Sequence, residues 1–212
     1  LIYVGVFIGM AFAGGVSMLW FLVAAGALVA AAPVLWNNFF DDYQKDRIEM
    51  LFNPEVDPEG LGVRWHTNQS QLSLNGGGFA GQGLFNGNRT QTDSLNAQHT
   101  DFVFSAIGEE LGFVGCMIVI VLLLAIIVRC IYVGIRSQAY MRRMICFGAA
   151  SALVFQVCVN IGMCIGVAPV IGLTLPLISY GGSSTVSLYA MLGLVSGVFA
   201  RPSPEVHERY IQ

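Results

Sequence analysis

The first 36 residues of the chain contain no charged side chain, and this feature most constrains the fold. A helix that crosses the hydrocarbon core of a bilayer needs about 20 mostly apolar residues. The uncharged run exceeds that length, and Gly14-Gly15-Val16-Ser17 interrupts it. We therefore predict the end of one membrane helix over residues 1–13, a tight turn, and a second helix over 18–36 that closes with Pro33 and Trp36.

Three further apolar stretches cover residues 102–133, 144–167 and 185–200. Residues 168–184, with two prolines and a glycine pair, are too broken for a straight helix. Only 11% of the residues are charged and 55% are hydrophobic, whereas soluble domains carry about 25% charged residues. We predict an all-α, polytopic transmembrane helix bundle of about four to five spans, forming a single membrane domain over 1–212.

Charge and cysteine usage narrow the classes of function. The formal net charge of −3 and the lack of a basic stripe argue against nucleic acid as a partner. The five cysteines lie in apolar stretches without a CxxC pair or metal-site spacing, so we interpret them as buried apolar side chains. The N-terminus lacks the basic region and cleavage site of a signal peptide, and we expect upstream helices of a longer protein to precede it.

A polar segment, residues 37–101, separates the second predicted span from the third and holds nine of the thirteen acidic residues. Arginines cluster instead in the 134–144 connection and in the C-terminal tail. Short arginine-rich loops stay in the cytoplasm. We therefore predict that 37–101 is a large extracellular loop, and that 134–144 and the C-terminus are cytoplasmic.

The pattern within this loop predicts short helices around an irregular stretch. Residues 41–51 have amphipathic spacing suited to a membrane surface, and residues 65–74 are compatible with a short helix. The glycine run at 76–83 denies the backbone a regular element. Apolar side chains recur between Trp65 and Phe85, which favours an ordered, functional loop over a disordered one.

Asp101 stands where the loop meets the 102–133 stretch, beside His99 and Thr100. One interpretation is a helix N-cap, in which Thr100 or Asp101 accepts the first free amides of the helix. The other is a catalytic base, because partial desolvation at the outer membrane boundary would raise the pKa of the carboxyl group. Spacing alone leaves both open.

Glu109 and Glu110 lie about two turns into the same stretch, where a carboxylate is costly and usually functional or paired. We interpret them as structural groups or as a relay, with a cation partner on a helix outside the chain. The glycines at 76–83, and Gly181 to Ser184 before the last span, could present amides to an anion. Close helix packing explains the second group equally well.

The sequence also contains a series of short motifs in a fixed order. They are Asn53-Pro54-Glu55, Asp57-Pro58, Gln69-Ser70, Gly76-Gly77-Gly78 through Gly81-Gln82-Gly83-Leu84, His99 to Phe104, Gly108 to Gly115, Pro169 to Gly172, and Pro176 to Ser184. Together they resemble the SEDS family of polytopic glycosyltransferases, whose members include RodA, FtsW and SpoVE. The resemblance covers nearly the whole chain.

The resemblance implies polymerisation of lipid II, the undecaprenyl-diphosphate-linked disaccharide-pentapeptide, during bacterial cell elongation or division. It implies that Asp101 is the catalytic base or a ligand of a divalent metal ion, Mg or Mn. A class B penicillin-binding protein is the implied partner, and the bacterial plasma membrane is the implied location. The substrate-binding residues implied in the same way are His99, Gln98, Gln69, Ser70, Gly77, Gly78, Gly81, Gly83, Ser183 and Ser184.

Two positions depart from the family pattern. Asn96-Ala97-Gln98 stands where the family usually has Pro-Glu before its His-Thr-Asp, and Gln82 stands where it usually has lysine. Two other functions remain open beside the glycosyltransferase. One is a lipid II flippase, with 168–184 as a discontinuous helix and Glu109 and Glu110 as a proton relay. The other is a non-catalytic scaffold of the cell-wall machinery.

Overall fold

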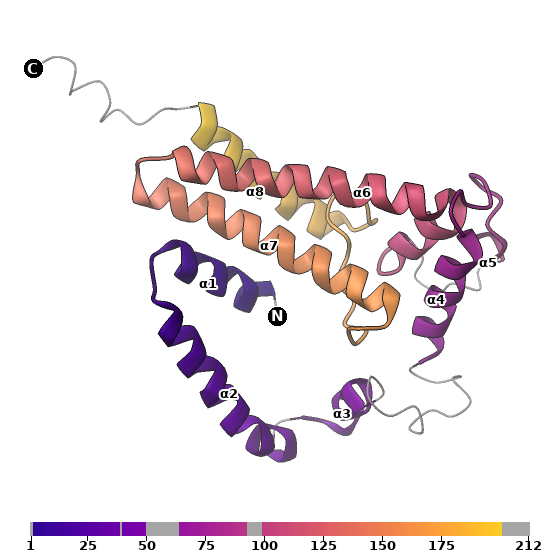
Figure 1. Cartoon of the computed structure of the whole chain (residues 1–212), viewed down its shortest axis with the longest axis horizontal. Coiled ribbons are helices and arrows are strands. Elements are labelled where there is room, and N and C mark those ends of the chain that lie inside the picture. The colour runs from indigo at the N-terminus through magenta and orange to yellow at the C-terminus, as the bar shows by residue number, and fades with distance from the viewer. Residues whose placement is uncertain (1, 39, 50–63, 93–98, 201–212) are drawn as a thin grey trace, which may run out of the picture. The chain divides into compact units, whose positions relative to one another are not determined.

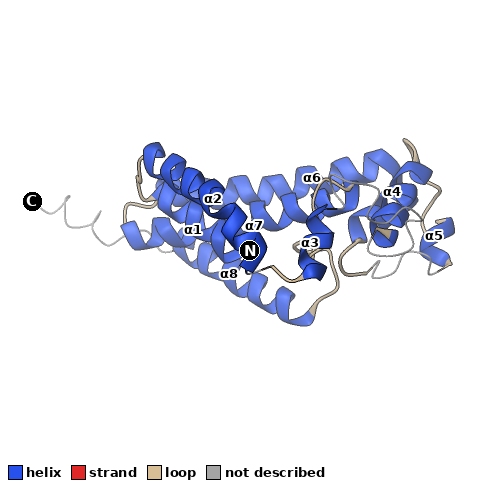
Figure 2. Ribbon diagram, turned by 90° about the horizontal axis from the view of Figure 1, so that it is seen from below, coloured by secondary structure: helices blue, strands red, loops and turns tan. Residues whose placement is uncertain are grey.

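The computed structural model describes residues 2–38, 40–49, 64–92 and 99–200. Within these ranges the secondary structure is helical, with no strand (Figure 2). The helices, labelled in Figure 1, are α1 (Ile2–Ala13), α2 (Met18–Asn38), α3 (Asp42–Glu49), α4 (Trp65–Gly77), α5 (Asn88–Gln91), α6 (Val103–Arg136), α7 (Tyr140–Ile165) and α8 (Gly182–Ala200).

The chain divides into two compact units. Unit 1 comprises residues 1–16, 118–158 and 176–212, and unit 2 comprises 17–117 and 159–175. The boundary between them falls inside α6 and inside α7. The single membrane domain expected over 1–212 stays a prediction, and each unit is considered by itself.

In the part of the chain that the structure describes, three helices are long and apolar enough to cross a membrane: α6, α7 and α8. The shorter apolar helices are α1 and residues 18–34 of α2. Many of their large apolar side chains face outward, as Phe7 and Trp20 do at 69% and 65% exposure. Such a surface suits lipid rather than water. The predicted class, a polytopic helical membrane protein, is confirmed, while the number of crossings and the side of each loop stay predictions.

Most element boundaries agree with the sequence predictions. The expected helix at 65–74 is present as α4, and the glycine pair before Val16 forms the turn between α1 and α2. Pro33 lies inside α2, which continues to Asn38 instead of closing at the proline. Residues 166–181 are non-helical, which agrees with most of the broken segment predicted over 168–184. The last helix, α8, begins at Gly182, three residues before the predicted span at 185–200.

The core of unit 1 joins α6, α7 and α8. Its buried residues are Ile127, Cys130, Val133, Cys146, Ala149, Ala150, Leu153, Leu188 and Val195. The α1 helix approaches α7 closely at Gly9, where an added Cβ atom would lie 1.7 Å from the Ser151 hydroxyl oxygen. Small residues at such crossings let membrane helices pack tightly.

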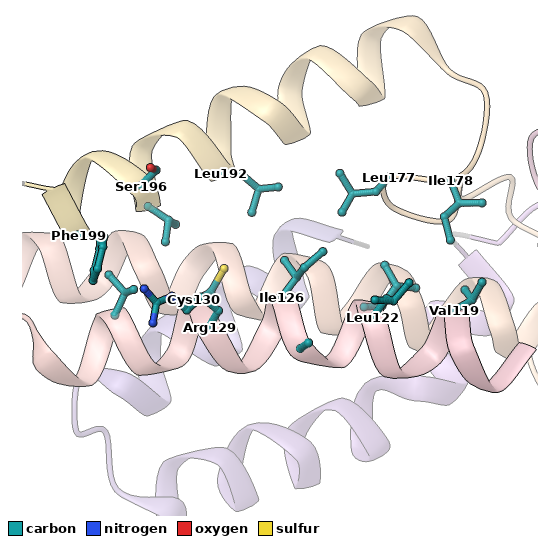
Figure 3. A pocket seen from close by; sticks show the side chains of 14 residues that line it. Val119, Leu122, Ile126, Arg129, Cys130, Leu177, Ile178, Leu192, Ser196 and Phe199 are labelled. Atoms are coloured by element: carbon teal, nitrogen blue, oxygen red, sulfur yellow. The ribbon is translucent and has the colours of Figure 1, made fainter.

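An apolar groove of about 680 Å³ lies in unit 1 between α6, α8 and residues 177–178 (Figure 3). Among the described residues that line it, Arg129 is the one with a charge, and its guanidinium carbon lies 4.6 Å from the centre of the Phe199 ring. An arginine inside a spanning helix is costly unless its charge is compensated, and contact with an aromatic face provides part of that compensation.

In unit 2 the main irregularity is a kink in α6. Gly112 has φ +68° and ψ −164°, so the helix is interrupted there. In a regular helix, the amides of Phe113 and Val114 would donate to the carbonyls of Glu109 and Glu110, four residues earlier. The kink leaves these two amides and two carbonyls without their helical partners.

Residues 78–83, which follow α4, bond all four of these groups. The carbonyls of Gly78 and Phe79 accept the two amides at 3.0 and 3.3 Å. The amides of Gln82 and Gly83 donate to the two carbonyls at 2.9 and 3.0 Å. Irregular backbone in a membrane protein is tolerated where protein groups satisfy it. The irregular segment is therefore held on α6 by backbone bonds, and we call this set of four bonds the kink ladder.

The kink ladder predicts that Gly112→Ala destabilises the protein. A Cβ atom at position 112 would lie 2.3 Å from the Gly81 amide nitrogen. The left-handed backbone alone costs a residue with a side chain about 1–2 kcal/mol, so we expect a total loss of about 2 kcal/mol or more. The measurement is the thermal unfolding midpoint in detergent.

Gly26→Ala in α2 is the matched control for this substitution. Nothing lies within 4 Å of a Cβ atom added there, and alanine has the higher helix propensity. We expect this variant to unfold at the same temperature as the wild type or slightly above it. Equal midpoints for the two variants would contradict the kink ladder.

Candidate functional site

Asn160 on α7 holds the backbone at Asp101. Its side-chain Nδ2 donates to the carbonyl of Asp101 at 2.9 Å and to the carbonyl of Leu173 at 2.6 Å. The Asn160 side chain is fully buried. One amide group therefore joins the 99–102 turn, which precedes α6, to the 166–175 segment, which follows α7.

A second buried polar cluster lies next to this contact. The hydroxyls of Ser70 and Ser105 are 2.5 Å apart, and Ser70 donates to the carbonyl of Cys164 at 2.9 Å. The Cys164 thiol in turn lies 3.8 Å from the Asp101 carbonyl oxygen. Ser70, Ser105 and Cys164 are all fully buried. The cluster ties α4, α6 and α7 together directly behind Asp101.

The Asp101 carboxyl group is half-buried. Desolvation raises its pKa above the usual value, and a hydrogen bond from the Thr100 side chain opposes that rise. A raised pKa means that the group keeps its proton up to a higher pH and is a stronger base when ionised. The 166–175 segment lies beside it, because a Cβ atom added at Gly172 would be 3.7 Å from Oδ2 of Asp101.

The start of α6 bears on the N-cap interpretation of Asp101. The helix begins at Val103, and the Phe102 carbonyl accepts the amides of Ser105 and Ala106 at 3.0 and 3.2 Å. The cap residue is the one whose carbonyl accepts the first helical bond. Phe102 thus occupies the cap position, and Asp101 precedes it. This placement weakens the capping explanation for the carboxylate.

His99 is exposed and lines a pocket of about 310 Å³ together with Thr90, Gln91 and Glu110. The remaining lining residues are mostly apolar and include Leu84 and Phe85. Gln98, the polar neighbour of His99, lies outside the described residues. Substrate contacts of these residues stay predictions.

Glu109 and Glu110 find partners in α5. Oε1 of Glu109 accepts the backbone amide of Arg89 at 2.7 Å, and Oε1 of Glu110 accepts the Thr90 hydroxyl at 3.2 Å. The Arg89 guanidinium donates to Oε1 of Gln69 at 2.5 Å. These contacts come from a loop helix within the chain, and they attach α5 to both α4 and α6. The buried Oε2 of Glu109 has no hydrogen-bond partner among the described residues, and a cation on a helix outside the chain stays a prediction.

The glycines expected to face substrate make close backbone contacts. A Cβ atom at Gly77 would lie 1.8 Å from the Gly108 carbonyl oxygen, and one at Gly81 would lie 2.1 Å from the Glu110 carbonyl oxygen. Gly78 and Gly83 have left-handed backbone, at φ +56° and +101°. Packing is a sufficient reason for glycine at 77 and 81, and a substrate contact stays a prediction for all four.

Gln82, at the position where the resemblance expects lysine, acts as a neutral bridge. Its Nε2 donates to the Gly76 carbonyl at 3.1 Å, and its Oε1 accepts the amide of Asn88 at 3.0 Å. The side chain thereby links the end of α4 to the start of α5.

Ser183 and Ser184 belong to unit 1, so they are not placed relative to Asp101. Ser183 is exposed, and the Ser184 hydroxyl donates to the Gly181 carbonyl at 3.0 Å. Within the described ranges, no three His, Cys, Asp or Glu side chains form a metal-binding group. Mg²⁺ is often held by one or two carboxylates together with substrate phosphates, and Asp101 fits that limited role.

The sequence patterns did not indicate that Asn160, Cys164 and Gly172 lie next to Asp101. One signal was present for Asn160, because a primary amide in an apolar span is costly and calls for a partner. Its two acceptors lie 59 residues before it and 13 residues after it. They are backbone groups, which leave no mark in the side-chain pattern.

Comparison with known proteins identifies the family. The family model described as a cell cycle protein, FtsW/RodA/SpoVE, matches residues 1–202. The chain belongs to this family. The resemblance inferred from the motifs is confirmed.

Two curated relatives of this chain are named as peptidoglycan glycosyltransferases. The peptidoglycan glycosyltransferase MrdB of Escherichia coli K12 is 39% identical over 181 residues, which are 84% of this chain and 48% of MrdB. The peptidoglycan glycosyltransferase RodA of Treponema pallidum is 34% identical over 184 residues, which are 86% of this chain and 42% of that protein. The chain spans about half the length of the curated relatives it matches.

A solved structure agrees with the family assignment. It comes from work on the structural coordination of polymerization and crosslinking by a peptidoglycan synthase complex. The similar chain in it is 33% identical, with a TM-score of 0.70, and the match covers 92% of this chain and 52% of that one.

The contacts of Glu109 predict that Glu109→Leu releases α5. The substitution leaves the Arg89 amide without its acceptor, which costs about 1–3 kcal/mol for a buried group. Trypsin should then cut after Arg89 about ten times faster or more in detergent, because local opening limits the cleavage.

Glu109→Gln keeps the acceptor oxygen, so its rate of cleavage after Arg89 should fall between those of the wild type and Glu109→Leu. Glu49→Leu, at an exposed carboxylate at the end of α3, is the control. Unchanged cleavage at Arg89 in Glu109→Leu would refute the anchoring role.

Proposed function

We propose that this chain is the part of a peptidoglycan glycosyltransferase that carries the catalytic carboxylate, Asp101. The observation that carries the proposal is the state of Asp101. Its carboxyl group is half-buried and has a raised pKa, and its main-chain carbonyl accepts a hydrogen bond from the buried Asn160. Family membership and the names of the relatives support the reaction class. The substrate would be lipid II, polymerised into glycan strands during elongation or division.

The reaction makes two demands on the protein. A sugar hydroxyl must lose a proton as its oxygen attacks the anomeric carbon, and the lipid diphosphate must leave with its developing negative charge stabilised. The Asp101 carboxylate would accept the proton, or hold a cation that lowers the pKa of the hydroxyl. A divalent ion, Mg²⁺ or Mn²⁺, would supply charge for the diphosphate when bound.

The membrane setting fits a lipid-linked substrate. Its polyprenyl tail must stay in hydrocarbon while the sugars react at the surface, and long apolar helices next to a polar loop provide both environments. In this proposal the 37–101 loop is extracellular, 134–144 and the C-terminus are cytoplasmic, and the host membrane is the bacterial plasma membrane. His99, Gln98, Gln69, Gly78 and Gly83 would be secondary contacts for the sugars and diphosphate.

The partner would be a class B penicillin-binding protein, which supplies the transpeptidase. The similarity to a chain of a peptidoglycan synthase complex supports a partner in cell-wall synthesis. Assays should therefore use the full-length protein together with that partner.

Asp101→Asn tests the proposal directly. Removal of a general base costs about 100-fold to 10,000-fold in rate, so fluorescent lipid II should give no detectable glycan strands. Asp41→Asn makes the same change at an exposed carboxylate in unit 2 and should leave the rate unchanged. Thermal unfolding midpoints of both variants should match the wild type. Strand synthesis by Asp101→Asn at the wild-type rate would exclude Asp101 as the catalytic group.

The flippase alternative makes the opposite prediction in a vesicle assay. Lipid II translocation would depend on Glu109 and would tolerate Asp101→Asn, because a flippase would need the proton relay at Glu109 and would not need Asp101 as a base. A scaffold would tolerate loss of either carboxylate in both assays. Strand synthesis that requires Asp101 therefore separates the glycosyltransferase from the other two functions, and translocation that requires Glu109 separates the flippase from the scaffold.

A further inference from the structure

Asn160 is a fully buried primary amide in α7, among mostly apolar neighbours in the sequence. Both hydrogen bonds donated by Nδ2 go to main-chain carbonyls, those of Asp101 and Leu173. Its Oδ1 is buried and has no hydrogen-bond partner among the described residues. A buried amide with an unsatisfied oxygen is unfavourable for folding. The benefit of this residue must therefore come from what its two donor contacts hold.

The two acceptors lie on different segments, and both segments border the carboxylate of Asp101. One is the carbonyl of Asp101 itself, in the turn before α6. The other is the carbonyl of Leu173, directly after Gly172, whose left-handed backbone at φ +72° lies beside Oδ2 of Asp101. A single amide therefore fixes the carboxylate relative to the 166–175 segment.

Hydrogen bonds to the main chain of a residue can hold that residue in place and leave its side chain free to bind a ligand. The carbonyl of Asp101 is occupied by Asn160, and the carboxylate stays half-exposed and available to a ligand. The thiol of Cys164 approaches the same carbonyl at 3.8 Å, which is a much weaker contact. Of these two contacts, the hydrogen bond from Asn160 is the stronger restraint on the main chain at Asp101.

We propose that Asn160 is a positioning residue for the Asp101 carboxylate, which it aligns by clamping the main chain at Asp101 to the main chain at Leu173. The proposal rests on the catalytic role proposed for Asp101. Loss of the clamp would leave substrate affinity largely intact and would misalign the base, because small displacements of a reacting group cost rate more than binding.

The test uses the full-length protein with its partner, fluorescent lipid II as the substrate, and steady-state kinetics. Asn160→Leu removes both donors at similar volume. We expect kcat to fall about 10-fold to 100-fold and KM to stay within about threefold. Leu153→Ala is the control for destabilisation, because it creates a cavity on the same helix in the core of unit 1. This control should lower the thermal midpoint and keep kcat within about threefold.

Asn160→Asp, which keeps the shape and presents one donor only when protonated, is the second variant. It should lose at least about fivefold in kcat with KM unchanged. Wild-type kcat in either Asn160 variant would overturn the proposal. So would a loss of kcat that Leu153→Ala reproduces at the same thermal midpoint. If neither Asn160 variant folds, the residue is a fold determinant and the positioning role is rejected.

Asp101→Asn in the same preparation separates this proposal from the one it rests on. An inactive Asp101→Asn beside a fully active Asn160→Leu would reject only the positioning role. An active Asp101→Asn would reject the catalytic assignment of Asp101, whatever Asn160→Leu does.

Discussion

In unit 2, four backbone hydrogen bonds hold residues 78–83 on the interrupted part of α6. The interruption at Gly112 leaves two amides and two carbonyls of α6 without helical partners, and residues 78–83 form hydrogen bonds with all four groups. Each partner needs the other, because unpaired backbone groups at a membrane helix are costly and a glycine-rich loop has little fold of its own. As a result, residues 78–83, which connect α4 to the segment before α5, are held on α6.

The path from the kink to Asp101 consists of buried polar contacts in the same unit. The end of α4 rests against Gly108 at Gly77, where the two backbones allow no Cβ atom. The middle of α4 contributes Ser70, which binds the Cys164 carbonyl of α7. One turn earlier on α7, Asn160 holds the carbonyl of Asp101. The carboxylate that the proposed reaction requires is therefore supported on its main chain and left accessible at its side chain.

Local patterns in the sequence were enough for the long apolar helices, for α4 and for most of the broken segment predicted over 168–184, because hydropathy and glycine content act over a few residues. The kink at Gly112 could not be predicted from them, since it lies inside an apolar stretch with a helical pattern. The partners of Glu109 and Glu110 lie 20 residues earlier, and that of Glu109 is a backbone amide. Motif order identified Asp101, whereas Asn160 required the packing of segments distant in sequence.

Residues 78–83 dock on the kink in α6 and thereby help to hold the site in place. Hydrogen–deuterium exchange of the full-length protein in lipid nanodiscs measures this directly at the amides of Gln82, Gly83, Phe113 and Val114. We expect slow exchange at all four, comparable to the core of α7, because each amide donates within the kink ladder. Exchange of these amides within seconds, as in an unstructured chain, would contradict this docking.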